Sequence, residues 1–181
     1  MRILFIILLT LTAQLSIAQL DWRATTSLEG RFRIYAPAQL VESTDTIETA
    51  VGKLVYHTFF HHTNPKSAEN VMYMLSYVDY PQGAMHSDSI SLLESFFHTT
   101  TTTAAEAVKG KLLYVSDTEL SGYPGRLWRI DYLEDEAVIR TRAYMVEDRY
   151  YALQTVSLRE RNLNRSGERF LDSFELLDKQ R

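Results

Sequence analysis

The chain has 181 residues and no cysteine, which excludes disulfides, thiolate metal sites, a nucleophilic thiol and a lipid-modified cysteine. Its formal net charge of −4 gives it no basic surface for nucleic acid or for an anionic membrane. Aromatic residues make up 12% of the chain, so packing alone is expected to hold the fold together.

The first 18 residues have the pattern of a secretory signal peptide. Arg2 supplies the charged start, Ile3–Leu9 the apolar run, and Ser16 and Ala18 the small residues before the cleavage point. The run is shorter than the roughly 20 residues of a membrane-spanning helix, which favours cleavage over an uncleaved anchor. We therefore expect export to the periplasm or the cell exterior, and residues 19–181 as one domain that is not integral to a membrane.

Four strands are predicted in the first half of the chain. They are Gly30–Pro37, Thr46–Val51, Leu54–His62 and Val71–Tyr80. Asp21–Glu29 is expected to be a lead-in and Ser43–Asp45 a polar connection between strands. The last two strands are apolar on both faces, which indicates a sheet that is covered on both sides.

A change of period predicts a helix from Asp88 to Val108. Apolar or small residues recur there at steps of three and four, at Ile90, Leu93, Phe97, Thr100, Ala104 and Val108. Ser91 and Glu94 fit a capping box, and Gly110 is a natural stop. The β-branched run Thr99–Thr103 is expected to be a weak point.

The second half of the chain reads as an antiparallel meander that forms the centre of one sheet. A strand at Lys111–Leu120 leads to a turn at Gly122-Tyr123-Pro124-Gly125. Three further strands, Arg126–Leu133, Ala137–Val146 and Arg149–Val156, are separated only by short acidic turns. Asn162 or Asn164 then caps a final helix that ends near Ser173.

The first hairpin of the meander has one apolar and one charged face. With a two-residue loop at Asp135-Glu136, Arg129 lies opposite Arg142 and Asp131 opposite Arg140. A longer loop with another register is the alternative. The third strand has two equivalent choices of core face, Tyr150 with Ala152 and Val156, or Tyr151 with Leu153.

The charged face supplies the candidate binding residues Arg129, Asp131, Arg140 and Arg142. One interpretation is a set of cross-strand ion pairs with a structural role, at the surface or under a helix. The other is that three arginines on rigid strands receive an acidic ligand or partner, for which the planar guanidinium is suited.

The residues give no support for catalysis, a metal or a cofactor. His57, His61 and His62 share one predicted strand, where positions four apart are about 13 Å apart at about 3.3 Å per residue. No nucleophile elbow and no phosphate-binding glycine motif occurs in the sequence. The acids Glu134-Asp135-Glu136 lie in a predicted turn and are expected to be solvated. We therefore expect a protein that is not an enzyme.

Several local patterns resemble, in their order and spacing, the PsbP-like family. They are Gly30-x-Phe32-x-Ile34-x-x-Pro37, the mid-chain helix, Gly122-x-Pro124-Gly125, Arg142 before Tyr150-Tyr151-x-Leu153, and Phe170-Leu171-x-Ser173-Phe174. The resemblance implies an α+β fold in which an antiparallel sheet is sandwiched between helices. It implies binding or assembly without known catalysis. The photosystem and Ran-binding roles of other members are not carried over, since the first depends on a longer N-terminal extension and the second belongs to another compartment.

These observations lead to two functional hypotheses. The first is a non-catalytic module that binds or assembles another component of the bacterial cell envelope, whose identity the sequence does not give. The second is a carrier of a small ligand, in a pocket between the sheet and the mid-chain helix that Tyr73, Phe97 and Trp128 would line.

If the signal peptide is cleaved after Ala18, the exported protein begins at Gln19. Intact-mass spectrometry of the exported chain is expected to show that start. A mature chain that begins before Gln19 would contradict the predicted cleavage point.

Overall fold

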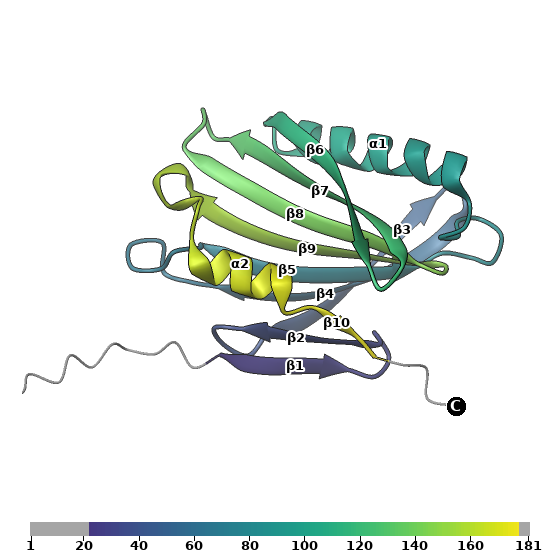
Figure 1. Cartoon of the computed structure of the whole chain (residues 1–181), viewed down its shortest axis with the longest axis horizontal. Coiled ribbons are helices and arrows are strands. Elements are labelled where there is room, and N and C mark those ends of the chain that lie inside the picture. Colours follow the sequence, from purple (N-terminus) through teal and green to yellow (C-terminus); the bar gives the residue numbers. More distant parts are fainter. Residues whose placement is uncertain (1–21, 178–181) are drawn as a thin grey trace, which may run out of the picture.

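The computed structural model describes residues 22–177, so the predicted signal peptide lies outside the described residues. Within that range the chain forms an α+β fold with two antiparallel sheets (Figure 1). The larger sheet has seven strands in the order β3-β4-β5-β9-β8-β7-β6. Its strands are β3 (Val41–Thr49), β4 (Gly52–His62), β5 (Met72–Asp79), β6 (Lys111–Leu120), β7 (Tyr123–Tyr132), β8 (Ala137–Val146) and β9 (Arg149–Leu158). The meander β6 to β9 therefore belongs to the main sheet, as predicted.

The central strand β9 is buried on both faces. Tyr151 and Leu153 point into the core on one side, and Tyr150 and Ala152 point into the core on the other. The two core faces that the sequence left open are therefore both used, because the sheet is covered on both sides.

One face of the large sheet is covered by the small sheet and the short helix α2 (Arg165–Asp172). The small sheet has the order β1 (Arg23–Ser27), β2 (Phe32–Ala36) and β10 (Glu175–Leu176). The core on this face includes Phe32, Ile34, Tyr77, Tyr151, Phe170 and Phe174. β1 was expected to be a lead-in; it was missed because only Thr25 of its five residues is buried, which leaves no apolar alternation to read.

The other face is covered by the helix α1 (Ile90–Ala107), which confirms the predicted mid-chain helix. Its predicted capping box is wrong, because Ser89 is the N-cap and Glu94 instead pairs with Arg126 on β7. The threonine run does not interrupt the helix. Thr101 is buried, and its hydroxyl donates to the carbonyl of His98 at 3.0 Å, within its own turn.

The expected sandwich of helices around the sheet is therefore found in part. A helix lies on one face, whereas the layer on the opposite face is mainly the small sheet, with α2 beside it (Figure 1). The antiparallel sheet and the α+β class agree with the prediction.

β3 forms an edge of the large sheet and is exposed at every residue. The sequence predicted a polar connection at Ser43–Asp45, but the strand runs through it. Its backbone pairs with β4 from Val41 to Thr49, and such pairing does not require apolar side chains. β3 carries Glu42, Asp45 and Glu48 and no basic residue.

The hairpin between β7 and β8 has a longer loop than predicted. Arg129 lies opposite Arg140 and Asp131 opposite Val138, while Leu127 faces Arg142. The two-residue loop is therefore wrong, and the longer-loop alternative is right. Because the register differs by an even number of residues, each side chain keeps the face that the sequence assigned to it.

Two glycines of the predicted motifs occupy positions without room for a side chain. A Cβ on Gly30 would lie 2.6 Å from the Phe32 ring and 2.8 Å from the Tyr77 ring. A Cβ on Gly125, inside β7, would lie 2.4 Å from the carbonyl oxygen of Ala143 on β8. Close approach of the small sheet to the large one, and of β7 to β8, therefore depends on glycine.

Arg149 ties the turn between β1 and β2 to the large sheet. Its guanidinium donates to both carboxylate oxygens of Asp79 and to the carbonyl of Glu29, each at 2.6 Å. It also lies 4.6 Å from the centre of the Tyr77 ring. Burial lowers the pKa of Arg149, but hydrogen bonds to Asp79 and Tyr151 outweigh that effect and raise it.

Replacing Arg149 with Met is expected to lower the free energy of unfolding by about 2–3 kcal/mol, because buried charge-assisted hydrogen bonds are lost. The matched control is Arg33→Met, whose exposed pair with Glu175 spans 3.8 Å. That change is expected to cost no more than about 0.5 kcal/mol. Urea unfolding of both variants gives the comparison, and equal effects would contradict the anchoring role of Arg149.

Candidate functional site

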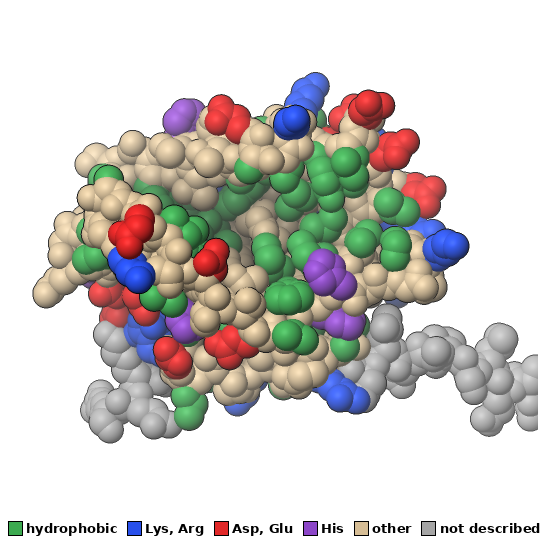
Figure 2. Space-filling view, turned by 180° about the vertical axis from the view of Figure 1, so that it is seen from behind, with side chains coloured by type: hydrophobic (Ala, Val, Ile, Leu, Met, Phe, Trp, Pro, Cys, Tyr) green, Lys and Arg blue, Asp and Glu red, His purple; other side chains and the backbone are tan. Residues whose placement is uncertain are grey.

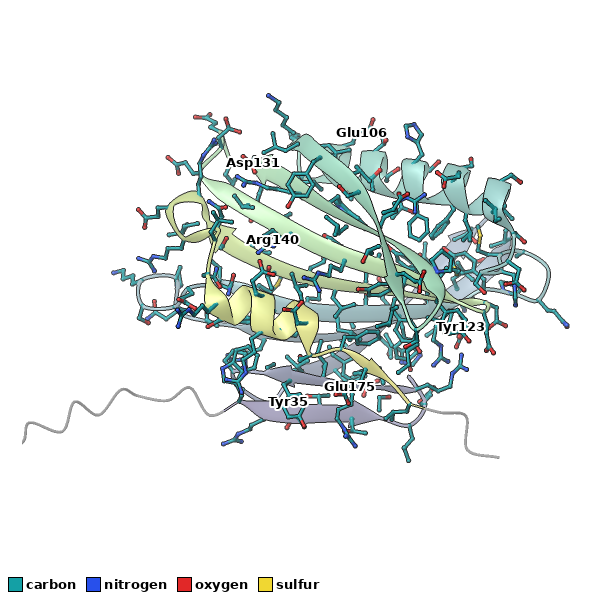
Figure 3. All side chains as sticks on the ribbon, in the orientation of Figure 1. Tyr35, Glu106, Tyr123, Asp131, Arg140 and Glu175 are labelled. Carbon is teal, nitrogen blue, oxygen red and sulfur yellow. The ribbon has the colours of Figure 1, made fainter. Side chains whose placement is uncertain are left out.

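The four predicted site residues lie on the face of the sheet that carries α2. Figure 3 labels two of them, Asp131 and Arg140. Arg129 donates to both carboxylate oxygens of Asp131, at 2.7 and 3.1 Å. Asp131 is buried, and Arg159 approaches it at 3.5 Å. Asn162 accepts a further hydrogen bond from Arg129 at 3.2 Å. This half of the charged face is therefore a satisfied cluster near the end of β9.

Arg140 and Arg142 face the carboxylates of α2. Arg140 forms an ion pair with Glu168, and Arg142 donates to Asp172 at 2.6 Å and lies 3.5 Å from Glu168. The guanidiniums are largely covered, whereas the side chains of Glu168 and Asp172 are 42% and 60% exposed. An acidic partner from outside would have to compete with these carboxylates, so the arginines act first as anchors of α2 on β8.

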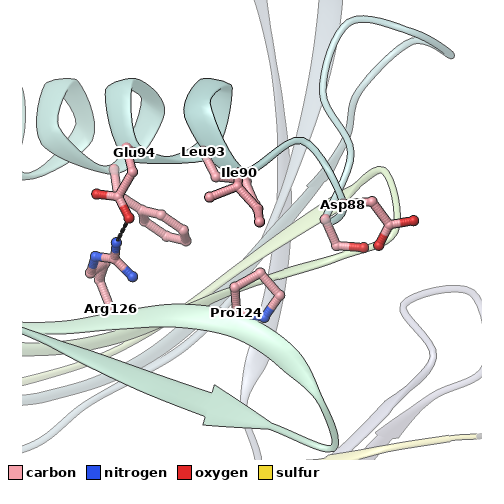
Figure 4. Close-up of a pocket in the computed structure, with 8 residues that line it drawn as sticks. Asp88, Ile90, Leu93, Glu94, Pro124 and Arg126 are labelled. Atoms are coloured by element: carbon pink, nitrogen blue, oxygen red, sulfur yellow. Dashed lines mark hydrogen bonds and ion pairs between the residues drawn. The ribbon is translucent and has the colours of Figure 1, made fainter.

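The opposite face offers two open hollows, one on each side of the first half of α1. The first has a volume of about 370 Å³ and contains charged groups, among them Asp88, Glu94 and Arg126 (Figure 4). Arg126 pairs with Glu94 and with Asp117, the latter at 3.2 Å, and stacks 5.2 Å from the Phe97 ring centre. The one arginine of this hollow is therefore already paired with carboxylates of the chain.

The second hollow, here the aromatic hollow, lies between α1 and the turn that joins β3 to β4. Its volume is about 440 Å³. Residues that line it include Leu54, Tyr56, Tyr80, Met85, Ser95 and Phe96. No residue in its lining is charged. The rim includes Val51 and Leu92, both of which are exposed apolar side chains.

Aromatic rings form the wall of the aromatic hollow. Phe96 packs edge-to-face with Tyr80 at 5.7 Å and with Tyr150 at 5.2 Å between ring centres. Burial raises the pKa of Tyr80, and the nearby hydroxyl of Tyr56 raises it further. Burial likewise raises the pKa of Tyr150, with smaller contributions from Tyr80 and Tyr56. Tyr80 and Tyr150 therefore stay protonated and neutral well above neutral pH.

Only part of the predicted ligand pocket is found. Phe97 lines the first hollow, and Trp128 is buried on the α1 side of the sheet. Tyr73 lies on the opposite face, where its ring is 5.3 Å from that of Phe170 and its hydroxyl accepts from Asn70. Both faces of β5 carry large apolar side chains, so alternation in the sequence did not show which face Tyr73 takes.

Beyond α1, the same face of the large sheet is left partly open. Phe60, Met72, Met74 and Ile139 are only half-buried there, and we call these four residues the open apolar strip. Phe60 lies opposite Met74, and Met72 and Ile139 both lie opposite Val156, so the strip crosses four neighbouring strands. Figure 2 shows apolar side chains gathered on this rear view of the molecule, with histidines among them.

The histidines of β4 do not converge. His57 stacks on Tyr77 with 4.5 Å between ring centres and lies 3.4 Å from Glu42. On the other face, the ring centres of His62 and Phe60 are 5.4 Å apart. In residues 22–177 no three side chains of His, Asp or Glu gather in a way that would hold a metal ion. None of the helices in that range has both the length and the apolar content that a membrane crossing requires.

The double change Arg140→Met and Arg142→Met is expected to loosen α2 while the sheet stays folded, because both ion pairs with the helix are lost. Each partly exposed pair contributes up to about 1 kcal/mol. Hydrogen exchange of the α2 amides is therefore expected to accelerate by about tenfold, with β9 unchanged. Arg33→Met serves as the control, and unchanged exchange in α2 would contradict the anchoring role.

No protein-family profile and no curated protein matches the sequence. Among solved structures, the chain is similar to the solution structure of cyanobacterial PsbP (CyanoP) from Synechocystis sp. PCC 6803, with a TM-score of 0.56. The two are 7% identical, and the match covers 89% of this chain and 95% of that chain. A likeness at this identity concerns the fold alone. The chain has the PsbP-like fold that its sequence motifs predicted.

Proposed function

We propose that this protein is an exported, non-catalytic binding module of the bacterial cell envelope. Its partner protein would cover the open apolar strip on the α1 side of the large sheet. The supporting observation is the strip itself, four apolar side chains of β4, β5 and β8 that are only half-buried on the α1 side of the sheet. Contiguous apolar surface that stays partly in water marks sites where another molecule binds.

The buried titratable side chains support a role without catalysis. Raised pKa values are found for Tyr73, Tyr77, Tyr80, Tyr150 and Tyr151, and also for Tyr132 and Arg149. All these shifts are upward, away from the neutral range in which a general acid or base exchanges protons. Burial is the main cause for the tyrosines, which fits a packing role.

Export is the part of the proposal that rests on the sequence. Residues 1–18 have the signal-peptide pattern, and the absence of cysteine leaves a fold that does not depend on the redox state of its compartment. The periplasm or the cell exterior follows as the place of action.

A small-ligand carrier is the second candidate, and the aromatic hollow favours it. Its volume of about 440 Å³ falls within the roughly 300–1,000 Å³ of small-molecule sites. The hollow combines an apolar wall with a few hydroxyl groups, the composition that such sites share. The aromatic hollow lies beside the mid-chain helix, where a ligand was expected, but Tyr73, Phe97 and Trp128 are not among the residues that line it.

Introducing a charge into the open apolar strip tests the proposed partner site. Met74→Lys is expected to weaken capture of the partner from envelope extracts by about tenfold or more. The charged lysine keeps its water and therefore opposes burial of the strip under a partner. The control is Tyr35→Lys on β2, an exposed aromatic of the small sheet. Quantitative mass spectrometry of the captured proteins compares the variants, with thermal unfolding to confirm their folding. Equal capture by both variants would place the partner elsewhere.

A further inference from the structure

We infer that the aromatic hollow binds an uncharged, flat apolar molecule that carries a hydrogen-bond acceptor. This inference rests on the small-ligand function, the second candidate above, and specifies the ligand of that site. It concerns a different surface from the open apolar strip.

The absence of charge in the lining selects against ionic ligands. None of the eleven residues that line the aromatic hollow is Asp, Glu, Lys, Arg or His. A carboxylate or an ammonium group that entered would lose water and gain no opposite charge in return, which is costly. The neighbouring hollow on the other side of α1 has three charged residues in its lining, so the difference is local to the two sides of one helix.

The aromatic and aliphatic side chains of the lining favour a ligand that is flat and apolar. Tyr56, Tyr80 and Phe96 contribute aromatic rings, and Leu54 and Met85 contribute buried aliphatic surface. Aromatic rings gain from stacked and edge-to-face contacts with another flat ring. Val51 and Leu92 at the rim are each 43% exposed, so a ligand that covers them removes further apolar surface from water.

The hydroxyl groups of the lining can donate hydrogen bonds, so the ligand is expected to carry an acceptor. Tyr56 and Tyr80 both line the aromatic hollow, and each carries a hydroxyl that can donate a hydrogen bond. Ser95, Thr49 and Thr99 add further hydroxyls to the lining. Because the hydroxyl of Tyr80 remains protonated, the pair acts as a donor to a neutral carbonyl or ether oxygen.

Fluorescence titration with Nile red, a neutral flat dye with a carbonyl acceptor, tests the inference on the folded protein. Saturable binding is expected to be lost in Ser95→Trp, where the new ring occupies the aromatic hollow. The matched control is Ile90→Trp, which lies on the same helix and lines the other hollow, and its binding is expected to be unchanged. Tyr80→Phe removes only a hydroxyl and is expected to weaken binding by about three- to tenfold.

A second probe tests whether the ligand must be uncharged, separately from whether the aromatic hollow binds a ligand at all. The anion 1-anilinonaphthalene-8-sulfonate has aromatic rings but carries a charge, and it is expected to bind at least about tenfold more weakly than Nile red. If the anion binds as tightly, and is lost in Ser95→Trp, the uncharged class is wrong while the carrier function stands. If Nile red binding is absent, or persists equally in Ser95→Trp and Ile90→Trp, both the inference and the carrier function fail.

Discussion

The structure depends on one constraint, which is that its central strands are apolar on both faces and must be covered on both. β9 is buried at eight of its ten residues. The chain meets this constraint with α1 on one side, and with the small sheet and α2 on the other. Arg149, at the start of β9, then fixes the β1–β2 turn through the carbonyl of Glu29. Since α1 covers only part of its face, the surfaces available for binding follow from the same constraint.

Elements with strong apolar periodicity could be predicted from the sequence, whereas elements ordered by backbone pairing could not. Leu93 and Phe97 face the core as the helical period predicts, but further along α1 the buried residues are Thr101 and Ala105 instead of Thr100 and Ala104. The predicted positions keep the helical step of 3.6 residues, whereas the buried residues recur every four, and the mixed Thr and Ala run gave no contrast to show the difference. β1 and β3 bury few side chains or none, so only their pairing with β2 and β4 reveals them.

The candidate sites likewise have features that could be predicted from the sequence and features that could not. Arg129, Asp131, Arg140 and Arg142 share one face because alternation along a strand is a local property of the sequence. Their partners were not predictable, since Glu168 and Asp172 reach β8 only once α2 has docked on the sheet. The aromatic hollow is formed by the β3–β4 turn, the end of β5 and α1 together, and no single segment carries its signature. Tyr73 was placed on the wrong face for the same reason that the sheet is stable, namely that both faces of β5 are apolar.

β3 is an edge strand that is exposed at every residue, which bears on self-association of the protein at high concentration. An edge strand exposes backbone donors and acceptors to which a second copy of the same strand would readily add. Glu42, Asp45 and Glu48 bring negative charge against negative charge in any such pairing, and β3 has no basic residue to relieve it. The acidic border therefore opposes the addition of a second copy of β3 at this edge, and it does so without a proline or a bulge in the strand.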